Sequence, residues 1–387
     1  MTLMSLRKMT DFLPGILVVA ILAAFARPAA AGLTYLGSLN GFSGQASPMV
    51  FTDELVAVNG DTATHIWRKN DLGSLPVFVG PPDIGRQRNQ VGLARKGDYV
   101  FAGAYGYKKE TMGSLITIDV SDPTDVHVVN TWEPEGIKFG RLIRRGNVLY
   151  SAFHFVGLAT IDITDPLDPQ FLDVYGSIED EFNGTDNIAL HGDYIFAGTN
   201  EDRVDIYNVA DPGDIQKVGS INTDSGNRWI SIHNDHLYVG HERGIAYRIV
   251  DIYDISDMSD IQQVGHYDAH FSATCHSFAF SGDYAFFVEN HSYQWSRGSF
   301  GIHMVDISDP TNPVQTDFFD TSELGQLYGD LGGCGIDGDR LYVPNYARDM
   351  IMVFEISGAQ APEPSAWAMA VMGLAGAGAL IRRRRRG

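Results

Sequence analysis

The sequence contains few of the motifs that identify enzymes and metal proteins. It has two cysteines in 387 residues, which is too few for a disulfide framework or a paired C-x-x-C metal site. No G-x-S-x-G, H-E-x-x-H or P-loop sequence occurs, and the Asp-rich segments lack the EF-hand spacing. These absences argue against the common hydrolase, zinc-protease, nucleotide-binding and calcium-binding classes.

Basic residues are also scarce. The chain carries 28 Lys and Arg against 48 Asp and Glu. Eight of the basic residues and two of the acidic ones lie in the two terminal segments discussed below, so residues 32–361 carry a formal charge of −26. A surface of this charge repels nucleic acid and anionic polysaccharide. We therefore expect no nucleic-acid partner.

One phrase recurs through the middle of the chain, and its clearest copy is GIHMVDISDPTNP at residues 301–313. Aligned on the second Asp of each turn, the copies are marked by Asp122, Asp165, Asp211, Asp257 and Asp309, with spacings of 43, 46, 46 and 52 residues. An apolar β-run that repeats with this period is typical of a propeller or a solenoid.

Each copy also follows a predicted hairpin. Segments such as ARKGDYVFAG (94–103) and ALHGDYIFAG (189–198) place a Gly-Asp pair between two β-runs, and Gly accepts the positive φ that tight turns need. In the SDP turn, the Asp side chain accepts turn N–H groups and Pro ends the ladder. Four strands in about 45 residues make one propeller blade.

This pattern resembles the LVIVD-repeat β-propellers over most of residues 33–357. Two copies depart from the motif, with Asn208 in place of the first Asp and Met258 in place of Pro. The resemblance implies an all-β propeller fold, but it implies no particular chemistry.

The number of blades follows from the two ends of the repeat region. Residues 33–41 match a fourth strand without the first three, and residues 335–357 supply three strands without a fourth. We expect the N-terminal strand to complete the last blade and close the ring, which removes both free edges. With a degenerate copy at 48–80 and five clear copies, residues 32–357 are predicted to form seven four-stranded blades.

The N-terminal segment, residues 1–31, is predicted to be a cleaved signal peptide. Arg7 and Lys8 precede an apolar run from Phe12 to Phe25, and three alanines precede Gly32. The apolar run is short for a membrane span, which favours cleavage over an uncleaved anchor.

The C-terminal segment carries a second signal. Residues 358–364 form a linker that contains Pro362, Glu363 and Pro364, and residues 365–387 form a predicted transmembrane helix with a basic tail, Arg382, Arg383, Arg384, Arg385 and Arg386. This arrangement is similar to PEP-CTERM sorting signals. The resemblance implies a Gram-negative bacterium, an exosortase-type processing enzyme, transient inner-membrane anchoring, and release to the cell surface or an exopolysaccharide matrix.

Candidate site residues come from the first strand of each blade, which lines the central channel. Six residues before the hairpin turn, three successive blades carry Asp186, Arg228 and His276. Beside them lie Asn89, Gln90, Asn187, Asn227 and Trp229. An acid, a guanidinium and an imidazole around one channel mouth could hold a ligand carboxylate or perform acid–base chemistry. The alternative is an ordinary polar channel mouth.

No cofactor and no dedicated metal site are expected, although the acidic turns could bind cations weakly. The two cysteines, Cys275 and Cys334, have opposite parity along their strands, which a bridge between neighbouring blades would require, but they lie about 10 Å apart along the strand direction, so we expect no disulfide. Cys334 is expected to be a buried core residue, with Cys275 nearer the rim.

Two functions fit these observations. The first is a non-enzymatic surface or matrix protein whose propeller binds a glycan or another protein. The second is an exported propeller hydrolase or lyase with its site at the channel mouth, which would need a buried acid or histidine with a shifted pKa.

Overall fold

The structure, a computed structural model, describes fifteen ranges of the chain. They are residues 31–42, 48–60, 63–80, 88–106, 113–135, 137–153, 157–176, 185–199, 202–223, 229–245, 248–268, 274–290, 301–324, 331–345 and 348–358. The predicted transmembrane helix and the sorting residues lie outside these ranges. None of the helical segments in the described ranges has the length and hydropathy needed to cross a membrane.

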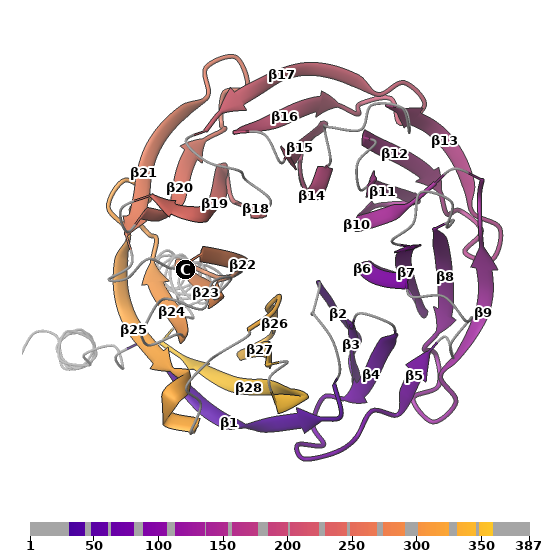
Figure 1. The fold of residues 1–387 in the computed structure, drawn as a ribbon, viewed down its shortest axis with the longest axis horizontal. Coiled ribbons are helices and arrows are strands. Elements are labelled where there is room, and N and C mark those ends of the chain that lie inside the picture. The colour runs from indigo at the N-terminus through magenta and orange to yellow at the C-terminus, as the bar shows by residue number, and fades with distance from the viewer. Residues whose placement is uncertain are drawn as a thin grey trace, which may run out of the picture.

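The described chain forms seven four-stranded antiparallel sheets arranged in a ring (Figure 1). This confirms the predicted all-β, seven-bladed propeller. The first strand of each blade lies nearest the ring axis and the fourth lies outermost (Figure 1). The apolar β-runs of the repeat form the third strands.

The blades are numbered here in chain order and their strands are given from the axis outward. Blades 1 to 4 consist of β2 (Met49–Phe51), β3 (Leu55–Asn59), β4 (Thr64–Arg68) and β5 (Phe78–Gly80); β6 (Arg88–Lys96), β7 (Tyr99–Gly106), β8 (Ser114–Asp119) and β9 (His127–Trp132); β10 (Phe139–Arg145), β11 (Val148–Phe153), β12 (Gly157–Asp162) and β13 (Gln170–Tyr175); and β14 (Thr185–His191), β15 (Tyr194–Thr199), β16 (Arg203–Asn208) and β17 (Gln216–Asn222). Blades 5 to 7 consist of β18 (Trp229–His233), β19 (His236–Ile245), β20 (Arg248–Asp254) and β21 (Gln262–Asp268); β22 (Thr274–Ser281), β23 (Tyr284–Asn290), β24 (Gly301–Asp306) and β25 (Val314–Asp320); and β26 (Gly335–Asp337), β27 (Arg340–Asn345), β28 (Met350–Ser357) and β1 (Gly32–Asn40). A 3-10 helix, η2 (Thr321–Leu324), follows β25.

The N-terminal strand is the outermost strand of the last blade. β1 pairs antiparallel with β28 from Gly32 opposite Ser357 to Asn40 opposite Met350. Leu33 N–H also donates to an Asp317 carboxylate oxygen in the neighbouring blade, at 2.7 Å. The two ends of the repeat region are thus joined in one sheet.

The hairpins between first and second strands have the predicted turns. Gly97, Gly146, Gly192, Gly282 and Gly338 all have φ between 54° and 62°. Asn234 takes the same left-handed conformation in blade 5, with φ 51°. These residues supply the positive φ that a two-residue hairpin needs.

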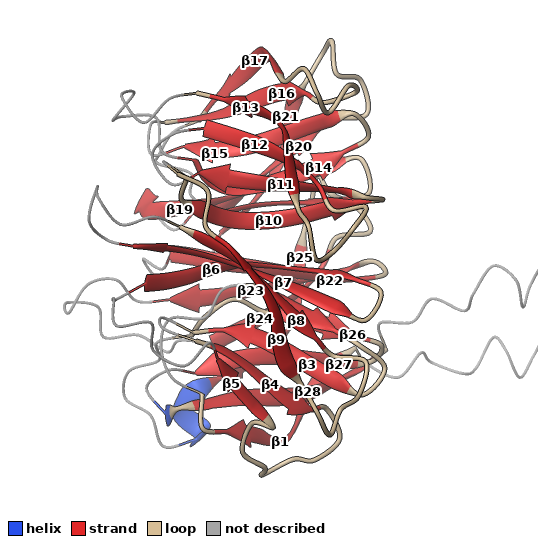
Figure 2. Ribbon diagram, turned by 90° about the vertical axis from the view of Figure 1, so that its right-hand side faces the viewer, coloured by secondary structure: helices blue, strands red, loops and turns tan. Residues whose placement is uncertain are grey.

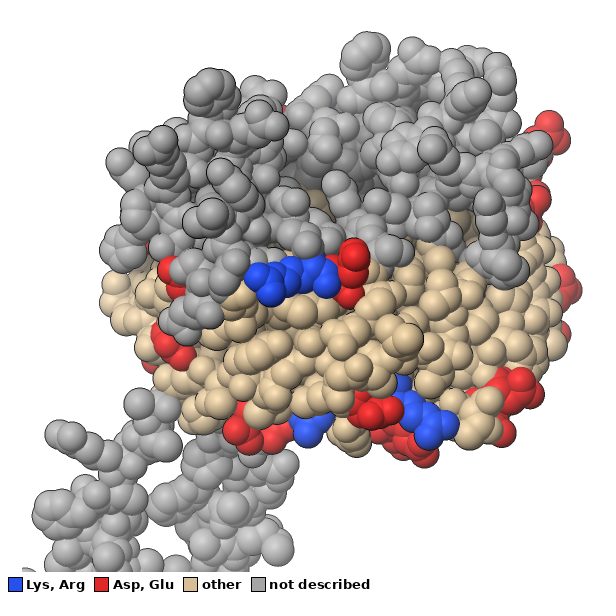
Figure 3. All heavy atoms as spheres, turned by 60° about the horizontal axis from the view of Figure 1, so that its bottom comes forward, with Lys and Arg blue, Asp and Glu red and all other residues tan. Residues whose placement is uncertain are grey.

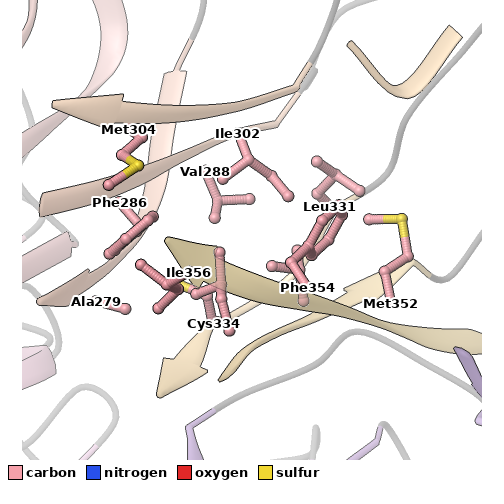
Figure 4. Packing of buried hydrophobic residues seen from close by; sticks show 12 residues of the cluster. Ala279, Phe286, Val288, Ile302, Met304, Leu331, Cys334, Met352, Phe354 and Ile356 are labelled. Atoms are coloured by element: carbon pink, nitrogen blue, oxygen red, sulfur yellow. The ribbon is translucent and has the colours of Figure 1, made fainter. Parts of the chain in front are cut away.

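Each pair of neighbouring blades encloses its own apolar core. One such core joins blades 6 and 7 and includes Phe286, Ile302, Phe354 and Cys334 (Figure 4). Another joins blades 7 and 1, with Leu39 of β1 packed against Trp67 and Val353. Small separate cores of this kind allow a propeller to exceed the size of a single-core domain.

The two faces of the ring differ in character. The turn face, as we call it, carries the hairpin turns and the Asp turns that follow the third strands, and Figure 2 shows the described turns gathered on one side. The loop face is the opposite one, where the first strands begin. Both β28 and its partner β1 reach the turn face at Ser357 and Gly32. Acidic side chains, with basic ones between them, lie along one rim of the described surface (Figure 3).

Candidate functional site

The inner strands share an irregularity near the loop face. Strand pairing shifts by one residue at Val91 in β6, at Asp186 in β14 and at His276 in β22, and it shifts between Phe139 and Leu142 in β10. Such a β-bulge leaves one residue unpaired and re-aims its side chain. Four blades therefore interrupt the ladder at equivalent points around the channel.

Two of the three principal candidates lie at these bulges. Asp186 and His276 are the extra residues of β14 and β22, and the backbone of Asn89 and Gln90 pairs with Tyr105 and Ala104. The side chains of these four residues, and Asn227 and Arg228 entirely, lie outside the described residues. Their proposed roles are therefore not tested by the structure.

The other two candidates line a small cavity at the ring axis. Asn187 and Trp229 face it together with Arg141, Ser277, Phe278 and Cys334, and its volume is about 30 Å³. These residues come from the inner strands of blades 3, 4, 5 and 6 and from the segment before β26. The described part of the channel thus brings polar side chains of several blades together.

Arg141 is the charged residue of the described cavity wall, and it is not among the residues predicted from the sequence. The position six residues before the hairpin turn is Gly140 in this blade. The bulge, however, places two residues, Gly140 and Arg141, opposite one residue of β11. The backbone here is tightly packed, because a Cβ on Gly140 would approach the Ala152 carbonyl oxygen at 2.6 Å. A side chain at residue 140 would not fit, so the polar group of this blade is the one that follows the glycine.

Arg141 has no anionic partner among the described residues. Its Nε makes no hydrogen bond within the described part of the chain. Burial lowers the pKa of the Arg141 guanidinium to about 10, so it still carries its charge at neutral pH. The Asn187 side-chain oxygen in the same cavity wall is also without a donor in the described part of the chain, and Asn187 is only 3% exposed.

The cysteines remain free, and the β22 bulge explains their positions. Cys334 N–H donates to Ser277 Oγ at 2.8 Å, and that oxygen lies 3.2 Å from the Cys334 Sγ. Cys275 is fully buried in the core between blades 5 and 6, whereas Cys334 lies in the core between blades 6 and 7. The expectation that Cys275 lies nearer the rim is corrected: the extra residue His276 turns the Cys275 side chain into the core on the opposite side of its sheet.

Burial keeps both thiols neutral. It raises the pKa of Cys334 to about 12, and the pKa of Cys275 rises further for the same reason. A neutral buried thiol is neither a nucleophile nor a counter-charge for Arg141.

The repeated aspartates have a structural role. Asp122, Asp257 and Asp309 each accept a backbone N–H two residues on, at 2.8 to 3.1 Å, and also the hydroxyl of the same Thr or Ser. Asp165 and Asp211 accept the corresponding backbone N–H, both at 2.9 Å. No group of three His, Cys, Asp or Glu residues within the described ranges is arranged to hold a metal ion.

Three successive blades also contain polar pairs in the middle of the sheet, in which at least the acidic member is buried. His241 Nε2 lies 3.0 Å from Asp251 Oδ2, and Lys217 Nζ lies 2.7 Å from Asp205 Oδ2. His303 Nε2 lies 2.8 Å from Glu289 Oε1, and both side chains are almost completely buried. These pairs lie inside the blades, and none of their residues lines the channel cavity.

A second hollow, of about 210 Å³, lies on the turn face between blades 5 and 6. Its His233 ring stacks on Phe280 and its Nε2 lies 2.8 Å from the Gly282 carbonyl oxygen. Burial lowers the pKa of His233, so this ring is neutral at pH 7 and already occupied by contacts within the protein.

Two family models match segments of the chain. Residues 296–321 match the LVIVD repeat, and residues 360–386 match the PEP-CTERM protein-sorting motif. The first match covers the clearest copy of the repeat phrase, and the second covers the C-terminal tripeptide and the whole arginine cluster. No curated protein sequence matches the chain.

Solved structures share the fold at low sequence identity. The β-propeller domain of Cps50 (Swd1) from Myceliophteria thermophila is 15% identical, with a TM-score of 0.57 over 84% of this chain and 100% of that one. A chain of a mitotic checkpoint complex is 11% identical, with a TM-score of 0.62 over 86% and 96% of the two chains. The computationally designed Ika8 protein is 13% identical, with a TM-score of 0.53 over 83% and 99%. These likenesses concern the fold alone.

Proposed function

We propose that this exported LVIVD-repeat β-propeller with a PEP-CTERM sorting signal is a binding or scaffold module of the cell surface or of an extracellular matrix. Its ligand is bound at the loop-face end of the channel. The observation that carries the proposal is the set of inner-strand bulges in four blades, where the same backbone position carries a different residue in each blade. Different residues at a common backbone position suit the recognition of an asymmetric ligand.

The sorting motif supports the route to that location. Residues 1–31 direct export, residues 365–387 anchor the chain in the inner membrane with Arg382 to Arg386 on the cytoplasmic side, and an exosortase-type enzyme cuts near Pro362 to Pro364. Because β28 ends at the turn face, the chain leaves the propeller there toward its anchor. The loop face and the channel mouth are then directed away from the membrane.

The pairing of β1 with β28 supports closure of the ring by the N-terminal strand in the mature protein. Closure protects the edge of β28 from pairing with other chains. Signal-peptide cleavage before Gly32 would leave this strand at the new N-terminus, where it needs no preceding segment to pair.

An exported hydrolase or lyase is the second candidate, and it depends on Asp186, Arg228 and His276 at the channel mouth. The cavity groups that the structure describes favour binding over this alternative, because Arg141 and Asn187 can hold a ligand but neither can accept a proton at neutral pH. Substituting Asp186 and His276 together separates the two functions. If the protein is an enzyme, the wild type turns over its bound ligand and the double variant does not. If it is a binding module, neither protein turns over the ligand, and the double variant only binds it more weakly.

The proposal is tested by fractionating cells that produce the full chain or a chain lacking its last 26 residues, and by screening residues 32–361 on a glycan array. We expect the full chain in the surface or matrix fraction without its C-terminus and the truncated chain in the periplasm. Retention of both forms in the same compartment would contradict the sorting role.

A further inference from the structure

The cavity at the ring axis contains an unusual combination of groups. Arg141 lines it and carries a positive charge, yet its Nε has no acceptor among the described residues. Arg141 is partly exposed as a whole, but its Nε is shielded from water, and a guanidinium that loses hydration without gaining an ion pair is destabilising. The arrangement is understandable if an anion from outside the protein completes it.

The described groups around Arg141 do not supply that anion. The Cys334 thiol is the one described titratable group with an electrostatic contact to Arg141, and burial keeps it protonated. Ser277 directs its hydroxyl oxygen to the Cys334 N–H and sulfur. The rest of the described wall, including Trp229, Ile230 and Phe278, is apolar or neutral.

A second polar atom in the cavity restricts the ligand further. Asn187 presents a side-chain oxygen that accepts no hydrogen bond from the described residues, and the residue is only 3% exposed to solvent. A ligand that satisfies both groups must accept hydrogen bonds at Arg141 and donate one at Asn187. A carboxylate with a neighbouring hydroxyl or amine has both properties.

We propose that this cavity binds the carboxylate end of a small 2-hydroxy or 2-amino acid, with the carboxylate on Arg141 and the neighbouring hydroxyl or amine donating to Asn187. The cavity volume of about 30 Å³ admits a group of this size and excludes a sugar ring. The ligand therefore enters by its carboxylate terminus, and any larger part of it extends along the channel. This inference deepens the proposed binding function by naming the ligand class at the channel.

The test is isothermal titration of purified residues 32–361 with glycolate, acetate and glycolamide. Glycolate should bind most tightly, acetate should bind more weakly because it lacks the donor for Asn187, and the neutral glycolamide should not bind. Equal heats from all three compounds, or none from glycolate, would overturn the proposal.

Two variants localise the binding. Arg141→Gln should weaken glycolate at least tenfold, and Asn187→Leu should reduce the preference for glycolate over acetate. The matched control is Arg144→Gln, which removes the same charge from the same strand, but at an exposed residue whose guanidinium donates to the Gly146 carbonyl oxygen at 2.6 Å. The control should bind glycolate like the wild type. A tenfold loss in the control would indicate a general charge effect and would contradict the assignment.

Thermal melting without ligand gives an independent readout. If Arg141 has no anionic partner in the unliganded protein, the Arg141→Gln variant should melt at the same temperature as the wild type or higher. The substitution removes a positive charge that no acid of the protein compensates. A large fall in melting temperature would show that Arg141 is held by an acid of the protein itself, and would overturn the proposal even if binding were lost. Failure here would leave the sorting experiment unaffected, so the two claims can fail separately.

Discussion

The turn face and the channel end of the inner strands are built on the same repeat, but they use it in opposite ways. On the turn face, blade after blade places an Asp at the same point, and that carboxylate is engaged by the backbone two residues on. At the channel end, equivalent bulge positions carry Val91, Gly140 followed by Arg141, Asp186 and His276. One region is constant in sequence and satisfied internally, whereas the other varies and leaves polar atoms unpaired.

This difference indicates which residues a repeat protein needs for folding and which it has free for recognition. A residue that recurs in every blade serves a purpose common to every blade, which is the turn. A residue that differs among blades at a common backbone position contributes to an asymmetric surface. The acidic turns account for much of the negative charge and are engaged by their own backbone, whereas the Arg141 guanidinium in the cavity is the more informative charge.

The largest effect should come from removing the strand that joins the two ends of the ring. A chain that begins at Ser47 lacks β1 and exposes the edge of β28, together with apolar side chains that Leu39 and Phe42 now cover. We expect a loss of several kcal/mol in unfolding free energy and aggregation at micromolar concentration. Melting and size-exclusion chromatography measure both. A truncated chain that stays monomeric with an unchanged melting temperature would show that the ring does not depend on β1.

The next effect separates internal polar pairs from surface ones. Glu289→Ala leaves His303 without its buried carboxylate partner, and breaking such a pair costs about 3 kcal/mol or more. The control is Asp268→Ala, which removes the carboxylate from the exposed pair with His266 and should change little. Chemical denaturation of the two variants measures the difference. Equal, small changes would mean that the buried pair contributes little to the stability of blade 6.

A smaller effect is expected on the turn face. Asp309→Ala removes the acceptor for the Thr311 N–H and hydroxyl, and should lower the melting temperature by about 2 °C. Asp309→Asn keeps an oxygen acceptor and should cost less. Glycolate binding should be the same in both. A turn variant that loses glycolate binding would break the distinction between the two regions.

The smallest effect is a pH dependence of stability. Hydrogen bonds from Ser121 and Thr164 hold the pKa values of Asp119 and Asp162 below their usual 3.8. A carboxyl group with a lowered folded-state pKa stabilises the fold above its unfolded pKa, and that contribution is lost as the pH falls through the folded value. The contribution of these two carboxyl groups to the melting temperature should therefore be level from pH 7 to about pH 5 and fall below about pH 4. Asp162→Asn should make that fall shallower, and an identical pH profile would contradict this origin.

The fold could be predicted from the sequence because its signals are local and repeated. Gly-Asp hairpins, apolar third strands and Asp turns each occur several times. A strand that is hard to assign in one copy can therefore be assigned by comparison with the other copies. The site could be predicted only in outline. Counting along a regular strand led to Asp186 and His276, which are bulge residues, and passed over Arg141 because a one-residue bulge in β10 is not visible in the letters FGRLIRRG.

The cysteines illustrate the same limit. Alternation along a regular strand would direct Cys275 toward blade 7, where Cys334 lies, and only the axial offset between the two residues would then oppose a bridge. The extra residue His276 instead turns Cys275 toward blade 5. The free thiols agree with the prediction, but the reason is the bulge, which depends on packing between blades and not on local propensity.

The distinction between the two regions is tested most directly by hydrogen exchange of residues 32–361 with and without glycolate, followed by mass spectrometry of peptides from each region. The account predicts that glycolate slows exchange in peptides spanning Phe139–Arg145 and Thr185–His191, and leaves the five Asp-turn peptides unchanged. Protection of the Asp turns with no change at the inner strands would contradict it.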